Sequence, residues 1–236
     1  MSPHPRSSPV ALLTLLCWLP APAAEEPAAA GSGTRPNDYV TRLEAALLLQ
    51  TLNADLLGHD SATATLERWC TAHQLASPPR ITAQRMMDVV KTPTAAQRQE
   101  LHVAPTDEVR YRRVRLRCGE VVLSEADNWY VPARLTPEMN KLLDTTDTPF
   151  GKAVQPLHFE RHTLSAEVLV DLLPPQWEMQ SPSSATATRT FCVPARVLQH
   201  RALLTLPDGT PFSEVVETYS SNVLAVPRLA PLPRCE

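Results

Sequence analysis

Apolar residues recur at helical spacing in two stretches near the start of the chain. Asp38 to Leu57 carries them three and four positions apart, and Asn37 or Asp38 can cap its first turn. A second such stretch begins at Asp60-Ser61 and ends at the Ser-Pro-Pro sequence of 77–79. Because Ser and Asp cap helices and Pro interrupts them, the pattern predicts two consecutive helices.

The pattern then changes to the alternation of strands. Between residues 108 and 118, Val114 and Leu116 face one way, whereas Arg113 and Arg115 face the other. A Gly-Glu turn leads into a second strand over 121–131, which predicts an antiparallel hairpin. A helix opens at Thr136, one or two strands follow within 156–173, and the strands 191–206 and 211–226 flank a Pro-Asp-Gly turn. This order predicts an α+β domain with a mostly antiparallel sheet, N-terminal helices and one inserted helix.

The extreme N-terminus has the three parts of a secretory signal peptide. A short polar start precedes an apolar run from Val10 to Leu19, and Ala21 and Ala23 fit the small-residue rule for cleavage. The run is too short to span a bilayer, which takes about 20 residues; the alternative is a buried helix of the mature fold. We expect a signal peptide over 1–23, a flexible leader over 24–37 and a single domain over 38–236. The domain is expected to be periplasmic or secreted, with no stable membrane insertion after the signal is removed.

Net charge bears on the expected binding partners, and cysteine content bears on the expected disulfides. The formal net charge of −3 gives no reason to expect nucleic acid as a partner. Four cysteines lie outside the signal peptide, an even number that permits two disulfides in an exported protein. Their three possible pairings stay open, and no spacing indicates zinc. These candidates are Cys70, Cys118, Cys192 and Cys235.

General catalytic motifs are absent, so single residues are the candidates for chemistry. His158, Glu160 and His162 alternate on one strand face, which is either a solvated face or a metal triad. On the strand before Pro132, the face of Glu125, Asp127 and Trp129 is a possible edge facing water. The alternative is that Asn128 and Tyr130, on the opposite face, are polar groups in a pocket. Glu217 is either a solvated carboxylate or a buried, paired acid.

Several segments, in this order, resemble the chorismate lyase family, whose fold is shared with ligand-binding domains of some transcription regulators. They are Leu56 to Glu67, the strand Arg113 to Glu120, Val131-Pro132, Thr148 to Gly151, and the last hairpin from Asp208 to Tyr219. The resemblance covers about residues 55–225. It implies a chorismate lyase-like fold and a small carboxylate-bearing ligand.

The resemblance also assigns roles to individual residues. Arg113 would bind the ligand carboxylate, and Glu217 would be the acid at its hydroxyl or ether end, with Glu214 as the rival for that position. Ala62 and Phe150 would be apolar walls of the pocket. Asn128 stands where the family commonly has an arginine.

The function implied by the resemblance is release of pyruvate from chorismate, or from a related ring, to give 4-hydroxybenzoate. That reaction requires no metal or organic cofactor. The first alternative is a non-catalytic periplasmic domain that binds a small aromatic acid, and the second is a domain used only for protein contacts. Export fits poorly with chorismate, which is made and used inside cells, so the substrate of an exported relative is expected to differ.

Overall fold

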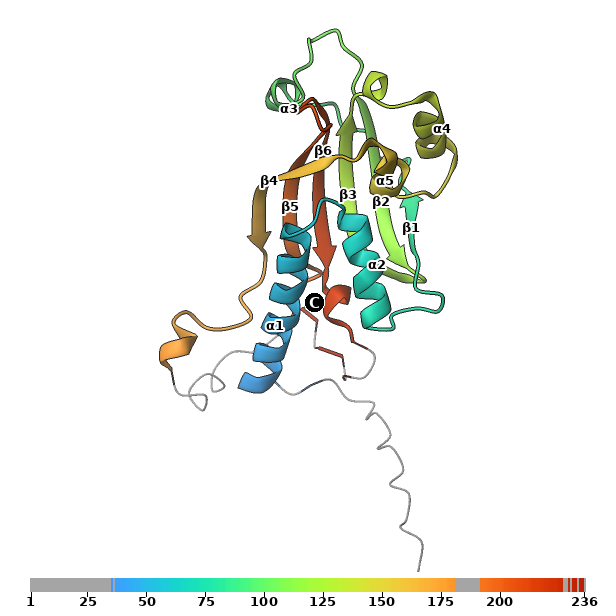
Figure 1. The fold of residues 1–236 in the computed structure, drawn as a ribbon. Coiled ribbons are helices and arrows are strands. Elements are labelled where there is room, and N and C mark those ends of the chain that lie inside the picture. The colour runs from blue at the N-terminus through green and yellow to red at the C-terminus, as the bar shows by residue number, and fades with distance from the viewer. Residues whose placement is uncertain are drawn as a thin grey trace, which may run out of the picture.

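A six-stranded sheet organises the part of the chain that the structure describes. In this computed structural model the described residues are 35, 37–180, 192–226, 229, 231–232 and 234–235, so the predicted signal peptide lies outside them. The strand order is β1-β2-β3-β6-β5-β4, and neighbouring strands pair antiparallel (Figure 1). The strands are β1 (Ile81–Arg85), β2 (Arg110–Cys118), β3 (Val121–Tyr130), β4 (Glu160–Val168), β5 (Arg196–Thr205) and β6 (Pro211–Ser220). The predicted α+β class is confirmed, with β1 and β4 as the two edges.

Helices cover both faces of this sheet unequally. The long helices α1 (Tyr39–Leu57) and α2 (Ala62–Ala72) lie across one face, here called the inner face, together with α4 (Pro137–Thr145) and α5 (Phe150–Ala153) (Figure 1). The short α3 (Ala95–Glu100) packs on the opposite, outer face. Short 3-10 turns occupy Pro132–Arg134, Gln155–Leu157, Trp177–Met179 and Ser221–Leu224. Within the described residues, no helix combines the length and apolarity needed to cross a membrane.

The caps predicted from the sequence are present. The Asp38 carboxylate accepts a hydrogen bond from the backbone N–H of Thr41 at 2.7 Å, and Ser61 Oγ accepts one from Ala64 at 3.2 Å. Both bonds satisfy first-turn amides that have no partner inside the helix. Past the inserted helix that opens at Thr136, the chain forms a further four-residue helix, α5, which begins at Phe150.

Two apolar clusters fill the inner face. Leu49 and Leu66 belong to a cluster under α1 and α2, whereas Tyr130, Phe150 and Phe212 belong to one under α4 and α5. A smaller cluster around Trp129 lies on the outer face. A small cavity lies where the two inner clusters meet.

Two disulfides tie distant segments to this framework. Cys70 is bonded to Cys118, which links α2 to the end of β2. Cys192 is bonded to Cys235, which links the start of the β5 segment to the C-terminal residues. Of the three pairings left open by the sequence, the structure therefore selects one.

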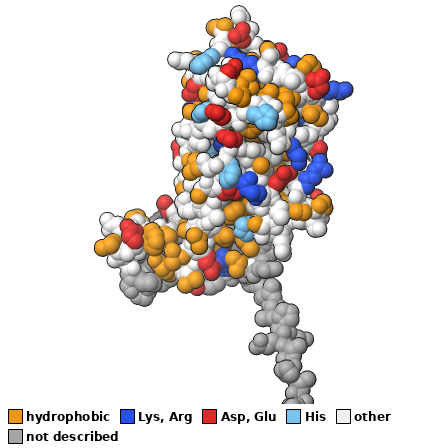
Figure 2. Space-filling view, in the orientation of Figure 1, with side chains coloured by type: hydrophobic (Ala, Val, Ile, Leu, Met, Phe, Trp, Pro, Cys, Tyr) orange, Lys and Arg blue, Asp and Glu red, His pale blue; other side chains and the backbone are white. Residues whose placement is uncertain are grey.

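An apolar patch remains on the surface where α1 meets the segment that follows β4. Orange side chains gather there in Figure 2, and a groove of about 600 Å³ runs between the two segments. Leu47 is 70% exposed and Trp177 is 38% exposed along it. This groove shares no lining residue with the site described next.

Candidate functional site

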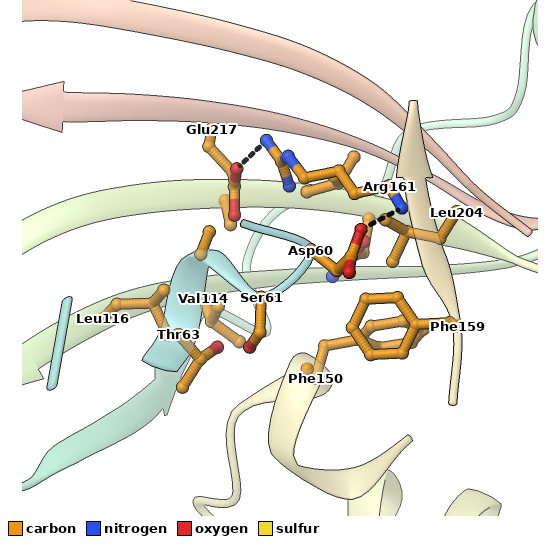
Figure 3. A pocket seen from close by; sticks show the side chains of 15 residues that line it. Asp60, Ser61, Thr63, Val114, Leu116, Phe150, Phe159, Arg161, Leu204 and Glu217 are labelled. Carbon is orange, nitrogen blue, oxygen red and sulfur yellow. Dashed lines mark hydrogen bonds and ion pairs between the residues drawn. The ribbon is translucent and has the colours of Figure 1, made fainter. Parts of the chain in front are cut away.

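A small cavity lies on the inner face where the two apolar clusters meet, between the sheet, the start of α2 and α5 (Figure 3). Its volume is about 30 Å³, enough for about two waters when each needs about 10–15 Å³. The apolar walls include Val114, Leu116, Ala126, Phe150, Phe159, Leu204 and Val215. The polar groups are Asp60, Ser61, Thr63, Asn128, Arg161 and Glu217. The cavity thus combines aromatic walls with a concentrated polar end.

The polar end is built on a buried ion pair. Arg161 Nη2 lies 2.6 Å from Glu217 Oε2, and the two side chains are only 3% and 7% exposed. The Tyr219 hydroxyl donates to the same carboxylate oxygen at 3.2 Å. Burial alone would lower the pKa of Arg161, but the Glu217 charge raises it above its usual value. Arg161 Nε is buried and has no hydrogen-bond partner among the described residues.

Three elements bring this pair to the cavity. Arg161 comes from the edge strand β4, and Glu217 comes from β6 in the middle of the sheet. The backbone N–H of Arg161 donates to Asp60 Oδ1 at 3.0 Å, which joins β4 to the loop before α2 (Figure 3). On the other side, a Cβ on Gly151 would lie 3.1 Å from Ser61 Oγ, so glycine allows α5 to pack tightly on the start of α2.

A buried histidine lies behind the ion pair. His200 is 0% exposed and is the cross-strand neighbour of Glu217. Its Nε2 is 2.8 Å from Asn53 Oδ1, and its ring makes an edge contact with Tyr219. Burial lowers the pKa of His200, opposed in part by the Glu217 charge. Its Nδ1 has no hydrogen-bond partner among the described residues, so this nitrogen can accept a proton.

Four residues expected at a binding site do line this one cavity. They are Ala62, Asn128, Phe150 and Glu217. Asn128 is 3% exposed, and its Oδ1 accepts a hydrogen bond from Ser213 Oγ at 3.2 Å. Of the alternatives left open by the sequence, Asn128 is a wall residue and Glu217 is a buried, paired acid. The carboxylate of Glu217 can accept a hydrogen bond from a ligand hydroxyl.

The expectation that Arg113 shares this cavity is wrong. Its side chain lies on the outer face, where Nη2 is 2.7 Å from Glu125 Oε2 and Nε is 3.7 Å from Asp127 Oδ1. Successive side chains of a strand point to opposite faces, so the arginine beside Val114 on the inner face is Arg112. A shift of one residue in the assignment places the charge on the wrong side of the sheet.

Glu214 does not compete with Glu217 for the cavity. It is 0% exposed on the outer face, where Arg201 Nε donates to its Oε1 at 2.8 Å and Gln97 Nε2 donates at 3.2 Å. Burial raises the pKa of Glu214, against the effect of these two donors. Of the two acids, Glu217 is therefore the one that lines the inner-face cavity.

The alternating His158, Glu160 and His162 do not form a metal triad in the structure. His158 precedes β4 in a left-handed conformation, and His162 Nε2 lies 3.0 Å from Thr205 Oγ1. Among the described residues, no three His, Cys, Asp or Glu side chains lie close enough to hold a metal. This segment contributes Arg161 to the cavity instead.

Sequence reasoning missed Arg161, Asp60 as a site residue and His200. Arg161 meets Glu217 across the pairing of β4 with β5 and of β5 with β6, 56 positions apart in the chain. A local pattern carries no signal of such a pairing. The nearest sequence signal was the charged stretch around Glu160, which marks where β4 begins.

The fold and the site together define an α+β domain that encloses a small cavity, with an Arg–Glu ion pair at its polar end. No protein-family model matches the chain. The chain is 50% identical over 198 residues to uncharacterized protein y4mC of Sinorhizobium fredii (strain NBRC 101917 / NGR234), covering 84% of this chain and 83% of that protein. The chain belongs to the same family as y4mC.

Solved structures show a weaker likeness. The effector domain of PhnF from Mycobacterium smegmatis superposes with a TM-score of 0.43 at 12% identity, over 69% of this chain and 90% of that chain. The C-terminal domain of the histidine utilization repressor from Pseudomonas syringae pv. tomato gives a TM-score of 0.39 at 12% identity, over 61% and 93% of the two chains.

Proposed function

We propose that this protein binds a small hydroxylated ring acid in the inner-face cavity. The observation that carries the proposal is the buried Arg161–Glu217 pair beside the rings of Phe150 and Phe159. A ring hydroxyl would donate to the Glu217 carboxylate. Arg161 Nε, which has no partner in the described part of the chain, would donate to an acceptor on the ligand. The resemblance to chorismate lyases implies that the ligand carries a carboxylate. In this proposal Arg161 takes the role that the sequence assigned to Arg113.

The charges that line the cavity affect how a ligand carboxylate can bind there. Asp60 and Glu217 already outnumber Arg161, the one cation among the residues that line this cavity. A ligand carboxylate adds a further negative charge in a buried place, where charges interact strongly. Binding is therefore expected to take up a proton, and His200 with its open Nδ1 is positioned behind Glu217 to receive it.

Calorimetric titration of the purified chain with 4-hydroxybenzoate tests this proposal. Glu217→Gln and Arg161→Gln should each weaken binding about tenfold or more, because each loses a charged hydrogen bond worth roughly 1.5–3 kcal/mol. Arg113→Gln is the matched control, since its side chain is on the outer face. Uptake of one proton should strengthen binding by up to about tenfold per pH unit as the pH falls.

Two results would overturn the proposal. One is 4-hydroxybenzoate affinity that Glu217→Gln and Arg161→Gln leave unchanged. The other is a loss of affinity in Arg113→Gln alone, which would move the ligand to the outer face.

We propose further that the same cavity is catalytic. Glu217 is a buried acid beside the place of a ligand oxygen, and an acid so placed can move a proton during loss of pyruvate from chorismate. Incubation with chorismate should then yield pyruvate and 4-hydroxybenzoate in equal amounts, and Glu217→Gln should abolish both. Binding of 4-hydroxybenzoate without either product would identify a binding domain.

We also propose that the protein is exported. The two disulfides support this, because such bonds persist in oxidising compartments. Fractionation of cells that express the full chain, with mass spectrometry of its N-terminus, should find a periplasmic or secreted form cleaved near residue 23. A cytoplasmic chain that keeps Met1 to Ala24 would contradict export.

A further inference from the structure

Helix α1 carries apolar side chains on two opposite sides. The side that packs on the sheet is fully buried and consists of Ala45, Leu49, Leu52 and Leu56. The other side, here called the outward stripe, consists of Val40, Leu43, Leu47, Gln50, Ala54 and Leu57. Leu47 is 70% exposed on it, Val40 is 61% exposed and Leu57 is 49% exposed. A surface helix normally has polar residues on the side away from the core, so the outward stripe departs from that pattern.

The spacing within the outward stripe indicates what kind of group would cover it. Its members lie alternately three and four positions apart, with Gln50 as the one polar side chain. This is the spacing by which one helix packs along another. From Val40 to Leu57 the stripe runs for about 25 Å at a rise of about 1.5 Å per residue. A second helix matches both the spacing and the length.

The apolar groove of about 600 Å³ lies along this stripe (Figure 2). From α1 it is lined by Leu43, Leu47 and Gln50, and its other wall, the segment that follows β4, includes Leu173 and Trp177. Amphipathic helices bind their partners by placing an apolar side in such grooves. Tryptophan is among the residues that contribute most to binding at protein interfaces.

The charges beside the groove are all negative. Lysine, arginine and histidine are absent from 43–57 and from 163–180, the two stretches that form its walls. On the second wall Glu167, Asp171 and Glu178 are exposed, and within the described residues they form no ion pair. A second copy of this surface would bring like charges together, and an anionic membrane would be repelled. Lysine or arginine on the occupant would instead be attracted.

We propose that the outward stripe and its groove bind an amphipathic helix of a partner protein. The apolar side of that helix would lie against Leu47 and Trp177, and its lysine or arginine side chains would face Asp171 and Glu178. The groove shares no lining residue with the inner-face cavity, so this inference does not depend on the function proposed there.

Two synthetic helical peptides serve as probes in calorimetric titration of the purified chain. The first, the lysine peptide, has leucines alternately three and four positions apart, flanked by lysines. The second, the glutamate peptide, has glutamate in place of every lysine. The lysine peptide should bind, and the glutamate peptide should bind at least about tenfold more weakly because its charges meet acids. Added salt should weaken binding of the lysine peptide, since exposed charges are screened.

Variants of the chain separate the apolar contribution from the charged one. Leu47→Ser should weaken binding of the lysine peptide by about tenfold or more, because it removes a leucine from the interface. Met87→Ser is the matched control, since Met87 is 71% exposed, as Leu47 is 70% exposed, and does not line the groove. Asp171→Lys combined with Glu178→Lys should reverse the preference, so that the glutamate peptide binds more tightly.

Several results would overturn the inference. They are absence of lysine-peptide binding to the wild type, equal binding of the two peptides, and an unchanged affinity in Leu47→Ser. Sedimentation that shows a dimer of the wild type, lost in Leu47→Ser, would identify a second copy as the occupant. Flotation of the wild type with phosphatidylcholine vesicles, lost in Leu47→Ser, would identify a lipid surface instead.

Discussion

Arg161 and Glu217 hold opposite charges almost entirely out of water. Removing both charges from solvent costs free energy that their attraction only repays when the geometry is good. The 2.6 Å contact and the hydrogen bond from Tyr219 provide that geometry. The pair is therefore expected to matter more for what the cavity recognises than for how stable the domain is.

The first prediction compares single and double variants of this pair. Arg161→Met and Glu217→Leu should each lower the free energy of unfolding by about 3–5 kcal/mol, because each leaves a buried charge without its partner. The double variant should recover most of that loss. Urea denaturation of the three variants and the wild type measures it, and additive losses in the double variant would mean that the two charges are not coupled.

The second prediction concerns His200 and pH. Burial lowers its pKa in the folded state, so the unfolded chain binds this proton more readily, and stability should fall as the pH drops below about 6.5. The slope from one such group is at most about 1.4 kcal/mol per pH unit. His200→Gln, which can still contact Asn53, should flatten the loss between pH 6.5 and 5. Unfolding curves at several pH values check this, and an unchanged slope in the variant would exclude His200 as the cause.

At the scale of elements, hydrophobic alternation and capping residues were sufficient to predict most of the sheet and the long helices. Alternation also placed Val114 and Arg113 on opposite faces of β2, yet similarity to a family motif favoured Arg113 as the ligand-binding residue. The structure shows that the alternation of side chains was more reliable than the motif, because the helices cover the face of Arg112 and not that of Arg113. The partner of Glu217 could not be predicted, since Arg161 reaches it only through the order of three strands.

The tight contact between α5 and the start of α2 gives the third prediction. Gly151→Ala would place a methyl group 3.1 Å from Ser61 Oγ and 3.2 Å from Thr63 Oγ1. Such overpacking should cost about 1–3 kcal/mol of stability and should also weaken ligand binding in the inner-face cavity. Thermal unfolding and titration measure the two effects. Thr63→Ala in the same chain should restore part of the stability, and no restoration would point to a cause outside this contact.

At the scale of the whole molecule, the disulfides hold the covering layer and the C-terminal residues to the sheet. Each encloses a long loop, with sequence separations of 48 and 43 residues. Closing loops of this length restricts the unfolded chain, which is the usual account of disulfide stabilisation.

The fourth prediction follows from these two bonds. Replacing Cys70 and Cys118 together with alanine should lower the free energy of unfolding by about 2–5 kcal/mol. Addition of dithiothreitol to the wild type should lower the urea midpoint in the same direction. Thiol titration of the native chain checks the premise, and free thiols at Cys70, Cys118, Cys192 and Cys235 would contradict it.

The position of Arg161 on an edge strand has a kinetic consequence. The inner-face cavity is too small for a ring as it stands, so its walls must move before a ligand enters. An edge strand has a neighbour on one side only and is among the first parts of a sheet to separate locally. If β4 is that moving wall, its opening sets the pace of exchange: at high ligand concentration the rate of entry would level off at the opening rate of the strand. Because Arg161 lies on β4, the guanidinium that binds the ligand would then also control the entry and release of that ligand.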